Sequence, residues 1–320
     1  MRLVILDGYT LNPGDLAWDE LKTFGELRVY DSTPNDQIVK RAEDAQVLIT
    51  NKTPLQADTL AALPDLRCIC ILATGYDMVD IAAAKARQIP VCNTPAYGVD
   101  AVAQHVFALL LELCRGVVKH DASVRSGEWG RRQEFCFWLS PQVELTEKTM
   151  GIVGFGNNGR RVGELAHAFG MEVLAYDPSA GTAAPGYAPF AFVELDELFA
   201  RSDVISLHCP LTEATRAMVN AKRLALMRKG SLLINTGRGP LLDEAAVAAA
   251  LHSGQLGGLG ADVLAVEPPL ADNPLLKTPN TYITPHIAWA SLRARGNIIS
   301  ITAANLRAFV EGKPQNVVNP

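Results

Sequence analysis

The chain has 320 residues, which at about 150 residues per domain predicts two domains. Hydrophobic residues make up 48% and charged residues 20% of the sequence, a composition that excludes disordered and fibrous proteins. The 29 Lys and Arg residues against 34 Asp and Glu residues give a net charge of −5. Because this balance provides no domain-wide basic surface, we expect no nucleic-acid partner.

The sequence offers no segment suited to a membrane span. Its most apolar stretch, 102–114, is interrupted by polar side chains such as Glu112 and is too short to cross a bilayer. The N-terminus, MRLVILDGY, has one basic residue and a four-residue apolar run, which is typical of a first β-strand rather than a signal peptide. We therefore expect a cytoplasmic protein with no membrane contact.

The cysteines lie mostly in apolar contexts. In RCICIL (67–72) a period-two spacing places two of them on one face of a buried strand. The sequence contains no C-x₂-C pair and no His partner at ligand spacing. It therefore predicts reduced structural thiols and no metal site.

Short apolar runs alternate with helical patterns along the chain. The first series of expected strands comprises 3–7, 45–50, 67–72 and 89–93. The second series comprises 149–156, 171–177, 203–208, 230–235 and 258–263. Helical patterns lie at 100–119, 158–169, 194–200, 220–227 and 243–253. Continuous apolar strands separated by helices predict parallel sheets covered on both faces. The expected fold class is therefore α/β with two doubly wound, Rossmann-like domains.

The end of the chain is expected to belong with its beginning. After Pro285 the sequence offers one long helical stretch, 288–311, and a short tail, which cannot form a domain alone. We expect this segment to pack on the first domain. The sequence thus predicts a discontinuous flavodoxin-like domain, 1–99 with 288–320, around a dinucleotide-binding Rossmann domain, 100–287.

A glycine-rich turn, GFGNNG (154–159), follows one strand of the second series and opens a helix. Gly154 would allow the tight turn, Gly156 the approach of a pyrophosphate, and Gly159 close packing of helix on strand. A packing turn without ligand, or a different nucleotide such as S-adenosylmethionine, stays open on this motif alone.

Asp177 ends the next strand, where it can bind both ribose hydroxyls of an adenosine. The following stretch, 178–186, contains no Arg or Lys to receive a 2′-phosphate. The sequence therefore favours NAD over NADP.

Three polar residues follow expected strands of the second series. Arg238 lies between two glycines after SLLIN, where its planar fork can reach a carboxylate. Glu267 follows GLGADV, and His286 follows the short strand TYITP. A carboxylate facing an imidazole fixes its tautomer and favours its protonated form, which suits acid–base chemistry. A solvated Arg and satisfied structural groups are the alternatives for each residue taken alone.

The remaining histidines fit packing or solvent roles, since they lie in helical or polar stretches: His105, His120, His167 and His252. His208 ends a strand beside Cys209 and would border a coenzyme. An aromatic cluster precedes the second series of strands and fits a core or a subunit interface better than catalysis: Phe135, Phe137 and Trp138.

Taken together, these motifs resemble the D-isomer-specific 2-hydroxyacid dehydrogenases, and the resemblance covers nearly the whole chain. The segments that carry it are GIVGFGNNG (151–159), Asp177, NTGRGPLLDE (235–244), ADVLAVEPP (261–269) and TPHIAWAS (284–291). Three segments resemble the glycerate dehydrogenase (hydroxypyruvate reductase) branch: ATGYDMVD (73–80), NTPAYGVDAVAQH (93–105) and PHIAWAS (285–291).

The resemblance implies reversible hydride transfer between NAD(H) and a D-2-hydroxy acid/2-oxo acid pair, with D-glycerate/hydroxypyruvate or glyoxylate first. His286 would be the acid/base, Glu267 its partner, and Arg238 a ligand of the substrate oxygens. Further substrate contacts, implied for the first domain, are the backbone of Thr74, Gly75 and Tyr76, and Arg295. The implied coenzyme contacts are Thr94, Asn157, Asn158, Asp177, Cys209, Thr236, Gly237, Arg238, Asp262 and His286.

The resemblance places Asp262 near the nicotinamide amide and implies a homodimer, in which Trp138 would approach the neighbouring subunit's site. The helix 101–119 could be an interface or a core helix. One departure concerns the coenzyme: relatives commonly have Arg-Ile where this chain has Asn157-Asn158, which removes a charged contact to the pyrophosphate.

Two other functions stay open. Another dehydrogenase of this scaffold, acting on D-lactate, a phosphorylated hydroxy acid or phosphite, would share these motifs. A non-catalytic NAD-sensing or protein-binding module is the second, and the set of Arg238, Glu267 and His286 argues against it.

Overall fold

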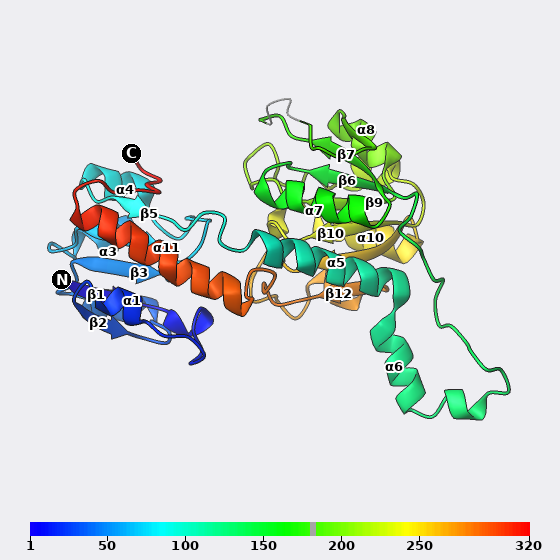
Figure 1. The fold of residues 1–320 in the computed structure, drawn as a ribbon, viewed down its shortest axis with the longest axis horizontal. Coiled ribbons are helices and arrows are strands. Elements are labelled where there is room, and N and C mark those ends of the chain that lie inside the picture. Colours follow the sequence, from blue (N-terminus) through cyan, green and yellow to red (C-terminus); the bar gives the residue numbers. More distant parts are fainter. Residues whose placement is uncertain (180–183) are drawn as a thin grey trace. The chain divides into compact units, whose positions relative to one another are not determined.

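The computed structural model describes residues 1–179 and 184–320, which form two compact units (Figure 1). The first unit comprises Met1–Gly98 and Ala290–Pro320, and the second comprises Val99–Trp289. The ranges expected from the sequence were 1–99 with 288–320, and 100–287. The chain thus leaves the first unit, completes the second, and returns to the first for its last helix.

The described residues of the first unit contain a five-stranded sheet in which all pairings are parallel. The strand order, β2-β1-β3-β4-β5, is the flavodoxin-like arrangement. The strands are β1 (Arg2–Ile5), β2 (Glu26–Val29), β3 (Val47–Thr50), β4 (Cys68–Ile71) and β5 (Val91–Cys92).

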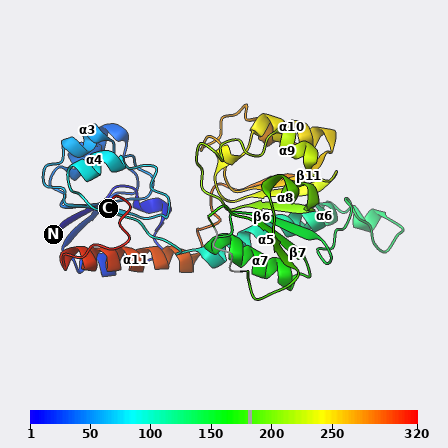
Figure 2. The same ribbon diagram turned by 90° about the horizontal axis from the view of Figure 1, so that it is seen from above.

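Helices cover both faces of this sheet, with α3 and α4 on one side and α11 on the other (Figure 2). Alternate strand residues such as Val4, Leu48 and Ile69 pack with α2, α3 and α4 in one buried apolar cluster. The cysteines of β4 alternate with its isoleucines and are buried. The neighbouring Cys70 thiol, together with burial, holds the pKa of Cys68 well above its usual range. The helices are α1 (Asp19–Lys22), α2 (Ile38–Ala42), α3 (Ala57–Ala61), α4 (Ile81–Ala86) and α11 (Leu292–Val310).

Where the structure describes it, the second unit contains a seven-stranded parallel sheet in the order β12-β11-β10-β9-β6-β7-β8. Counted from β6, this is the Rossmann order with one strand added at the far edge, and the order reverses between β6 and β9. The predicted fold class is therefore confirmed. The strands are β6 (Thr149–Val153), β7 (Glu172–Tyr176), β8 (Phe190–Phe192), β9 (Val204–Leu207), β10 (Ser231–Asn235), β11 (Leu256–Ala261) and β12 (Thr281–Ile283).

Helices cover both faces of this sheet (Figure 2), and among the described residues an apolar cluster fills the space on each face. One joins α5 and α7 to the strands, and the other joins α8, α9 and α10. The helices are α5 (Val99–Arg115), α6 (Val117–Arg125), α7 (Asn157–Ala168), α8 (Leu195–Arg201), α9 (Ala221–Leu226) and α10 (Glu244–Ser253).

The expected helix 100–119 is divided in the structure. Gly116 has a φ of +56°, in the left-handed region, so α5 ends before it and α6 begins after it. No single helix among 1–179 and 184–320 combines the length and hydropathy of a membrane span; α5 and α6, bent by 55°, reach those limits only as a pair.

Strands β2 and β8 have no counterpart among the expected strands. Both lie at an edge of their sheet, and neither contains a fully buried residue or a continuous apolar run. In β2, Glu26 and Arg28 alternate with apolar residues. An edge strand with one paired side can carry such charges.

Candidate active site

The loops after three neighbouring strands bring together the polar residues singled out from the sequence. Strands β10, β11 and β12 are adjacent and parallel, so their carboxyl ends share one edge of the sheet. Arg238 follows β10, Glu267 follows β11, and His286 follows β12. The three residues therefore lie at the edge where ligands bind in doubly wound sheets.

Glu267 and His286 form a hydrogen-bonded pair. Oε2 of Glu267 lies 2.7 Å from Nδ1 of His286, while Oε1 accepts the backbone N–H of Leu264 over 3.0 Å. The side chains are 37% and 27% exposed, so the pair is open on one side. Because Nδ1 faces the carboxylate, Nε2 is the ring atom that can meet a substrate.

The backbone of His286 adopts a left-handed conformation, with a φ of +56°. Its N–H donates to the carbonyl oxygens of Asp262 (2.8 Å) and Thr284 (2.9 Å). Its own carbonyl oxygen accepts the indole N–H of Trp289 over 2.8 Å. Such a conformation is uncommon outside glycine and persists only where the surroundings determine it, as they do here.

The buried carboxylate of Asp262 holds the turn 284–288. Its carboxylate is 1% exposed and accepts the N–H groups of Ile287 (2.8 Å, Oδ1) and Ala288 (2.8 Å, Oδ2) and the hydroxyl of Thr284 (2.6 Å, Oδ1). Both oxygens are thus engaged within the turn. The contact with a nicotinamide amide that the family resemblance implies for Asp262 stays a prediction.

Arg238 lies in a turn shaped by Asn235. The buried Asn235 side chain accepts the N–H of Gly237 (3.1 Å) and donates to the carbonyl oxygen of Arg238 (2.9 Å). One guanidinium nitrogen of Arg238 donates to the carbonyl oxygen of Gly237 over 2.9 Å. A Cβ at Gly239 would overlap the backbone of Leu264, so this turn packs directly on the loop that leads to Glu267.

The glycine-rich loop between β6 and α7 has the shape of a pyrophosphate site. Gly154 has a φ of +90°, and any Cβ there would press on the backbone of Cys209. A Cβ at Gly159 would overlap the carbonyl oxygen of Gly154, which explains the close packing of α7 on the loop. At Gly156 no atom of the described residues lies within 4 Å of a Cβ position, which leaves room for a ligand before the N-terminus of α7.

Asp177 is held in place at the end of β7. Its Oδ2 accepts the backbone N–H of Phe155 over 2.8 Å, and its Oδ1 accepts the N–H and hydroxyl of Ser179 over 2.9 and 2.8 Å. The carboxylate is therefore fixed beside the glycine-rich loop. Of the stretch 178–186, whose lack of Arg and Lys favours NAD, residues 180–183 lie outside the described residues.

Uncharged polar side chains also lie near the glycine-rich loop and the Arg238 turn. The hydroxyl of Thr236 is buried and has no hydrogen-bond partner in the described parts of the chain, as expected of a group that a ligand completes. Burial raises the pKa of the Cys209 thiol to about 11 and lowers the pKa of His208 to about 4. Asn157 and Asn158 open α7 and add no charge.

The predicted site residues of the first unit lie after β4, after β5 and in α11. Within the described residues, the N–H groups of Thr74, Gly75 and Tyr76 donate to no protein acceptor, so they are available to a ligand. Thr94 is fully buried, and its N–H donates to Ala73. Their contacts with substrate or coenzyme stay predictions.

Arg295 is engaged within the first unit. Its Nη1 and Nη2 each lie 2.7 Å from one carboxylate oxygen of Asp15, and its other bonds go to the carbonyl oxygens of Leu11 and Ala290. The pairing holds the pKa of the Asp15 carboxyl below its ordinary value. A substrate contact of Arg295 stays a prediction, and it would have to compete with this pair.

Three polar residues of the site region have roles that the sequence did not indicate: Asn235, Thr284 and His105. Asn235 shapes the Arg238 turn, and Thr284 bonds to Asp262. His105 of α5 contacts Thr284 across a separation of 179 residues. No local sequence pattern indicates a contact over this separation, and the sequence alone therefore predicts only a packing or solvent role for His105.

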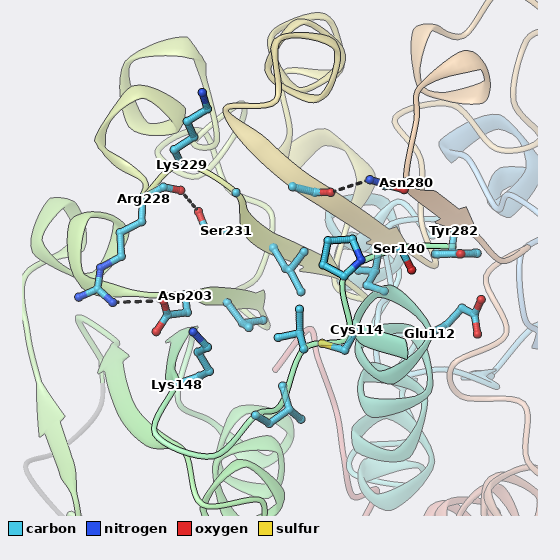
Figure 3. A pocket seen from close by; sticks show the side chains of 18 of the residues that line it. Glu112, Cys114, Ser140, Lys148, Asp203, Arg228, Lys229, Ser231, Asn280 and Tyr282 are labelled. Carbon is cyan, nitrogen blue, oxygen red and sulfur yellow. Dashed lines mark hydrogen bonds and ion pairs between the residues drawn. The ribbon is translucent and has the colours of Figure 1, made fainter. Parts of the chain in front are cut away.

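A hollow of about 360 Å³ lies at the opposite edge of the same sheet (Figure 3). Its lining includes the start of β9 and β10, with Arg228 paired to Asp203 over 3.2 Å and Lys148 nearby. This hollow is remote from the glycine-rich loop. In the described ranges, no three His, Cys, Asp or Glu side chains are arranged to hold a metal ion.

Comparisons with known proteins agree with this geometry. The NAD-binding domain of the D-isomer specific 2-hydroxyacid dehydrogenases matches residues 107–288. The hydroxypyruvate reductase of Blautia hydrogenotrophica is 44% identical over 100% of both chains. The glycerate dehydrogenase of Methylorubrum extorquens is 42% identical over 99% of this chain and 98% of its own.

A solved structure, the D-lactate dehydrogenase of Aquifex aeolicus complexed with NAD and lactic acid, superposes with a TM-score of 0.82 and 28% identity. It covers 100% of this chain and 99% of that one. The chain belongs to the D-isomer specific 2-hydroxyacid dehydrogenases. It is an oxidoreductase that acts on the CH–OH group with NAD as coenzyme, and its relatives include the hydroxypyruvate reductases and glycerate dehydrogenases.

Proposed function

We propose that this enzyme catalyses the reversible reduction of hydroxypyruvate by NADH and a proton to D-glycerate and NAD, with glyoxylate as a second substrate. The observation that carries the proposal is the Glu267–His286 pair at the edge shared with Arg238. The whole-length similarity to a hydroxypyruvate reductase and a glycerate dehydrogenase supports the choice of acid.

In this proposal, His286 carries the proton of the reaction. Nε2 donates it to the carbonyl oxygen during reduction and recovers it during oxidation. Glu267 fixes the imidazole through Nδ1, 2.7 Å from its Oε2, and so sets the orientation of the ring. Arg238 binds the carboxylate and carbonyl oxygens through its two-pronged guanidinium.

The coenzyme, when bound, supplies the hydride. In this proposal Asp177, which accepts the N–H of Phe155, also accepts the ribose hydroxyls, and the N-terminus of α7 receives the pyrophosphate. Thr236 has a buried hydroxyl available beside Arg238. The neutral state of Cys209 and His208 keeps added charge away from the phosphates.

The test is NADH oxidation at 340 nm with hydroxypyruvate, glyoxylate, pyruvate, a phosphorylated 2-oxo acid and 2-oxoglutarate. We expect the highest kcat/KM with hydroxypyruvate and NADH. Turnover confined to pyruvate or to the phosphorylated acid, or NAD reduction by phosphite, would assign another dehydrogenase of the same family. Failure with every substrate, with NADH still bound, would refute the proposal.

We also propose a homodimer in which an arm, defined here as residues 116–139, contacts a second copy. The arm extends from α5 away from the sheet of the second unit (Figure 1). It carries a cluster of exposed apolar side chains, of which Phe135 is 87% and Trp138 68% exposed. These aromatics do not belong to the core of the described chain, so of the two roles expected for them the interface is the one proposed.

Light scattering of the eluted protein tests this proposal. We expect a mass of twice the 34.4 kDa chain, and a shift toward the single chain for Phe135→Ser/Trp138→Ser. Tyr9→Ser, which changes a 58% exposed aromatic of the first unit, is the matched control and should leave the mass unchanged. A wild-type monomer, or a double variant that stays dimeric, would contradict the proposal.

We further infer a cytoplasmic location. All six cysteines are free, as expected where thiols are kept reduced. Fractionation of the source cells, followed by immunoblotting, would place the protein outside the cytoplasm if the inference were wrong.

A further inference from the structure

The turn that carries His286 is held by one buried carboxylate. Asp262 accepts three donors from residues 284–288, and its backbone carbonyl oxygen accepts a fourth, the N–H of His286. The direction of the His286 ring depends on this arrangement, because the left-handed backbone of the residue is fixed by it.

Helix α5 contacts the turn that Asp262 holds. His105, on α5, places its Nε2 2.9 Å from Oγ1 of Thr284 and 3.5 Å from Oδ1 of Asp262. The His105 side chain is 19% exposed, so the contact is largely shielded from water. Lowered access of water strengthens such a bond relative to one on the surface.

Hydrogen-bond bookkeeping fixes the direction of the His105 bond. The carboxylate of Asp262 can only accept, so the single hydroxyl proton of Thr284 is directed to Oδ1 at 2.6 Å. Oγ1 of Thr284 therefore accepts from His105, whose Nε2 must carry a proton. His105 thus donates to Thr284, and Thr284 donates to Asp262, whose carboxylate also accepts the backbone N–H groups of Ile287 and Ala288.

We propose that His105 is a positioning residue for His286, acting through Thr284 and Asp262. Without the Nε2–H of His105, Oγ1 of Thr284 loses its hydrogen-bond donor, and Asp262 loses its facing imidazole. The turn 284–288 then samples other conformations, and Nε2 of His286 leaves the line of proton transfer. This inference rests on the proposed function for its kinetic consequence, and on the turn alone for its structural one.

The kinetic test compares His105→Leu, which removes the donor, with His105→Gln, whose amide nitrogen can reach the place of Nε2. We expect kcat with hydroxypyruvate to fall about tenfold or more in His105→Leu, with the KM of the acid and the Kd of NADH changed less than about threefold. His105→Gln should recover most of kcat. In a His286→Ala background, His105→Leu should add less than about twofold.

Hydrogen exchange provides a readout that needs no turnover. The amides of His286, Ile287 and Ala288 all bond to Asp262, so a peptide covering 284–290 should exchange at least about tenfold faster in His105→Leu than in the wild type. His105→Gln should exchange like the wild type. His252→Leu, on the exposed side of α10 in the same unit, is the control for losing a helical histidine.

The two inferences can fail separately. A wild type that turns over no 2-oxo acid counts against the proposed function, while exchange of 284–290 still decides the role of His105. Unchanged exchange in His105→Leu overturns the positioning role, as does a kcat within twofold of an active wild type. Equal loss in the Leu and Gln variants would show a shape requirement in place of a donor, and would overturn it too.

Discussion

Oε2 of Glu267 lies 2.7 Å from Nδ1 of His286, at a residue whose backbone is left-handed. The two side chains come from loops after adjacent parallel strands, so the sheet sets their separation. A carboxylate and an imidazole in this arrangement form a proton donor with a fixed orientation.

His286→Asn removes the imidazole and keeps the turn, because Asn tolerates a positive φ better than most residues. We expect kcat to fall by roughly 10²–10⁴-fold, the range for loss of a general acid, with NADH affinity little changed. Steady-state kinetics with hydroxypyruvate measure the loss. Turnover close to that of the wild type would remove His286 from the proposed role, provided that the variant melts at the wild-type temperature.

Arg238→Lys keeps the positive charge and loses the two-pronged donor. The KM for the 2-oxo acid should rise roughly tenfold or more, while the Kd of NADH should move less. Arg201→Lys on α8, a half-exposed arginine paired with Glu197, is the control and should leave both constants unchanged. An unchanged KM in Arg238→Lys would place Arg238 outside the substrate site.

Asp177→Ser removes the carboxylate that Phe155 holds beside the glycine-rich loop. Because a fixed negative charge repels a 2′-phosphate, its loss should raise the NADPH:NADH ratio of kcat/KM roughly tenfold. The ratio is measured with both coenzymes at one concentration of the 2-oxo acid. If it stays constant, coenzyme choice does not depend on Asp177.

His208 makes the stability of the protein depend on pH. Burial lowers its pKa from 6.5 to about 4, and its Nε2 pairs with the hydroxyl of Ser206 over 2.8 Å. Between pH 6.5 and 4, His208 is therefore protonated in the unfolded chain and neutral in the folded chain. The stabilisation is complete above pH 6.5 and is lost as the pH falls toward 4, by about 3 kcal/mol in all.

Denaturant unfolding at pH 7.5, 6, 5 and 4.5 checks this dependence. In His208→Gln the free energy of unfolding should fall less steeply over the same interval than in the wild type. His252→Gln, which changes an exposed histidine, should follow the wild type. Parallel curves for wild type and His208→Gln would show that His208 is not the group responsible.

Local patterns were sufficient to predict most elements of the fold. Apolar runs such as 149–153 and 231–235 are buried on both faces, and their composition alone identifies them as inner strands. The edge strands β2 and β8 were not predicted, because their residues are partly exposed and form no continuous apolar run. The helix break at Gly116 was not predicted, because the sequence does not show that one glycine inside an apolar helical pattern adopts a positive φ.

The candidate site divides along the same line. Arg238, Glu267 and His286 could be assigned to one edge because each follows a strand of one parallel sheet. The bond from His105 to Thr284 could not be predicted from the sequence, because it joins positions 179 residues apart and depends on how α5 packs. The engagement of Arg295 by Asp15 is equally a product of packing, and no spacing in the sequence indicates it.

The left-handed backbone of His286 narrows the choice of amino acid at this position by two unrelated criteria. A positive φ favours Gly, Asn, Asp and His at this position. The proton transfer excludes Gly and Asn, whose side chains have no proton to exchange, and the facing carboxylate of Glu267 disfavours Asp. Histidine satisfies both criteria. A mutational path away from it therefore has no intermediate that preserves both folding and chemistry, so relocating the proton donor would require rebuilding the loop as well.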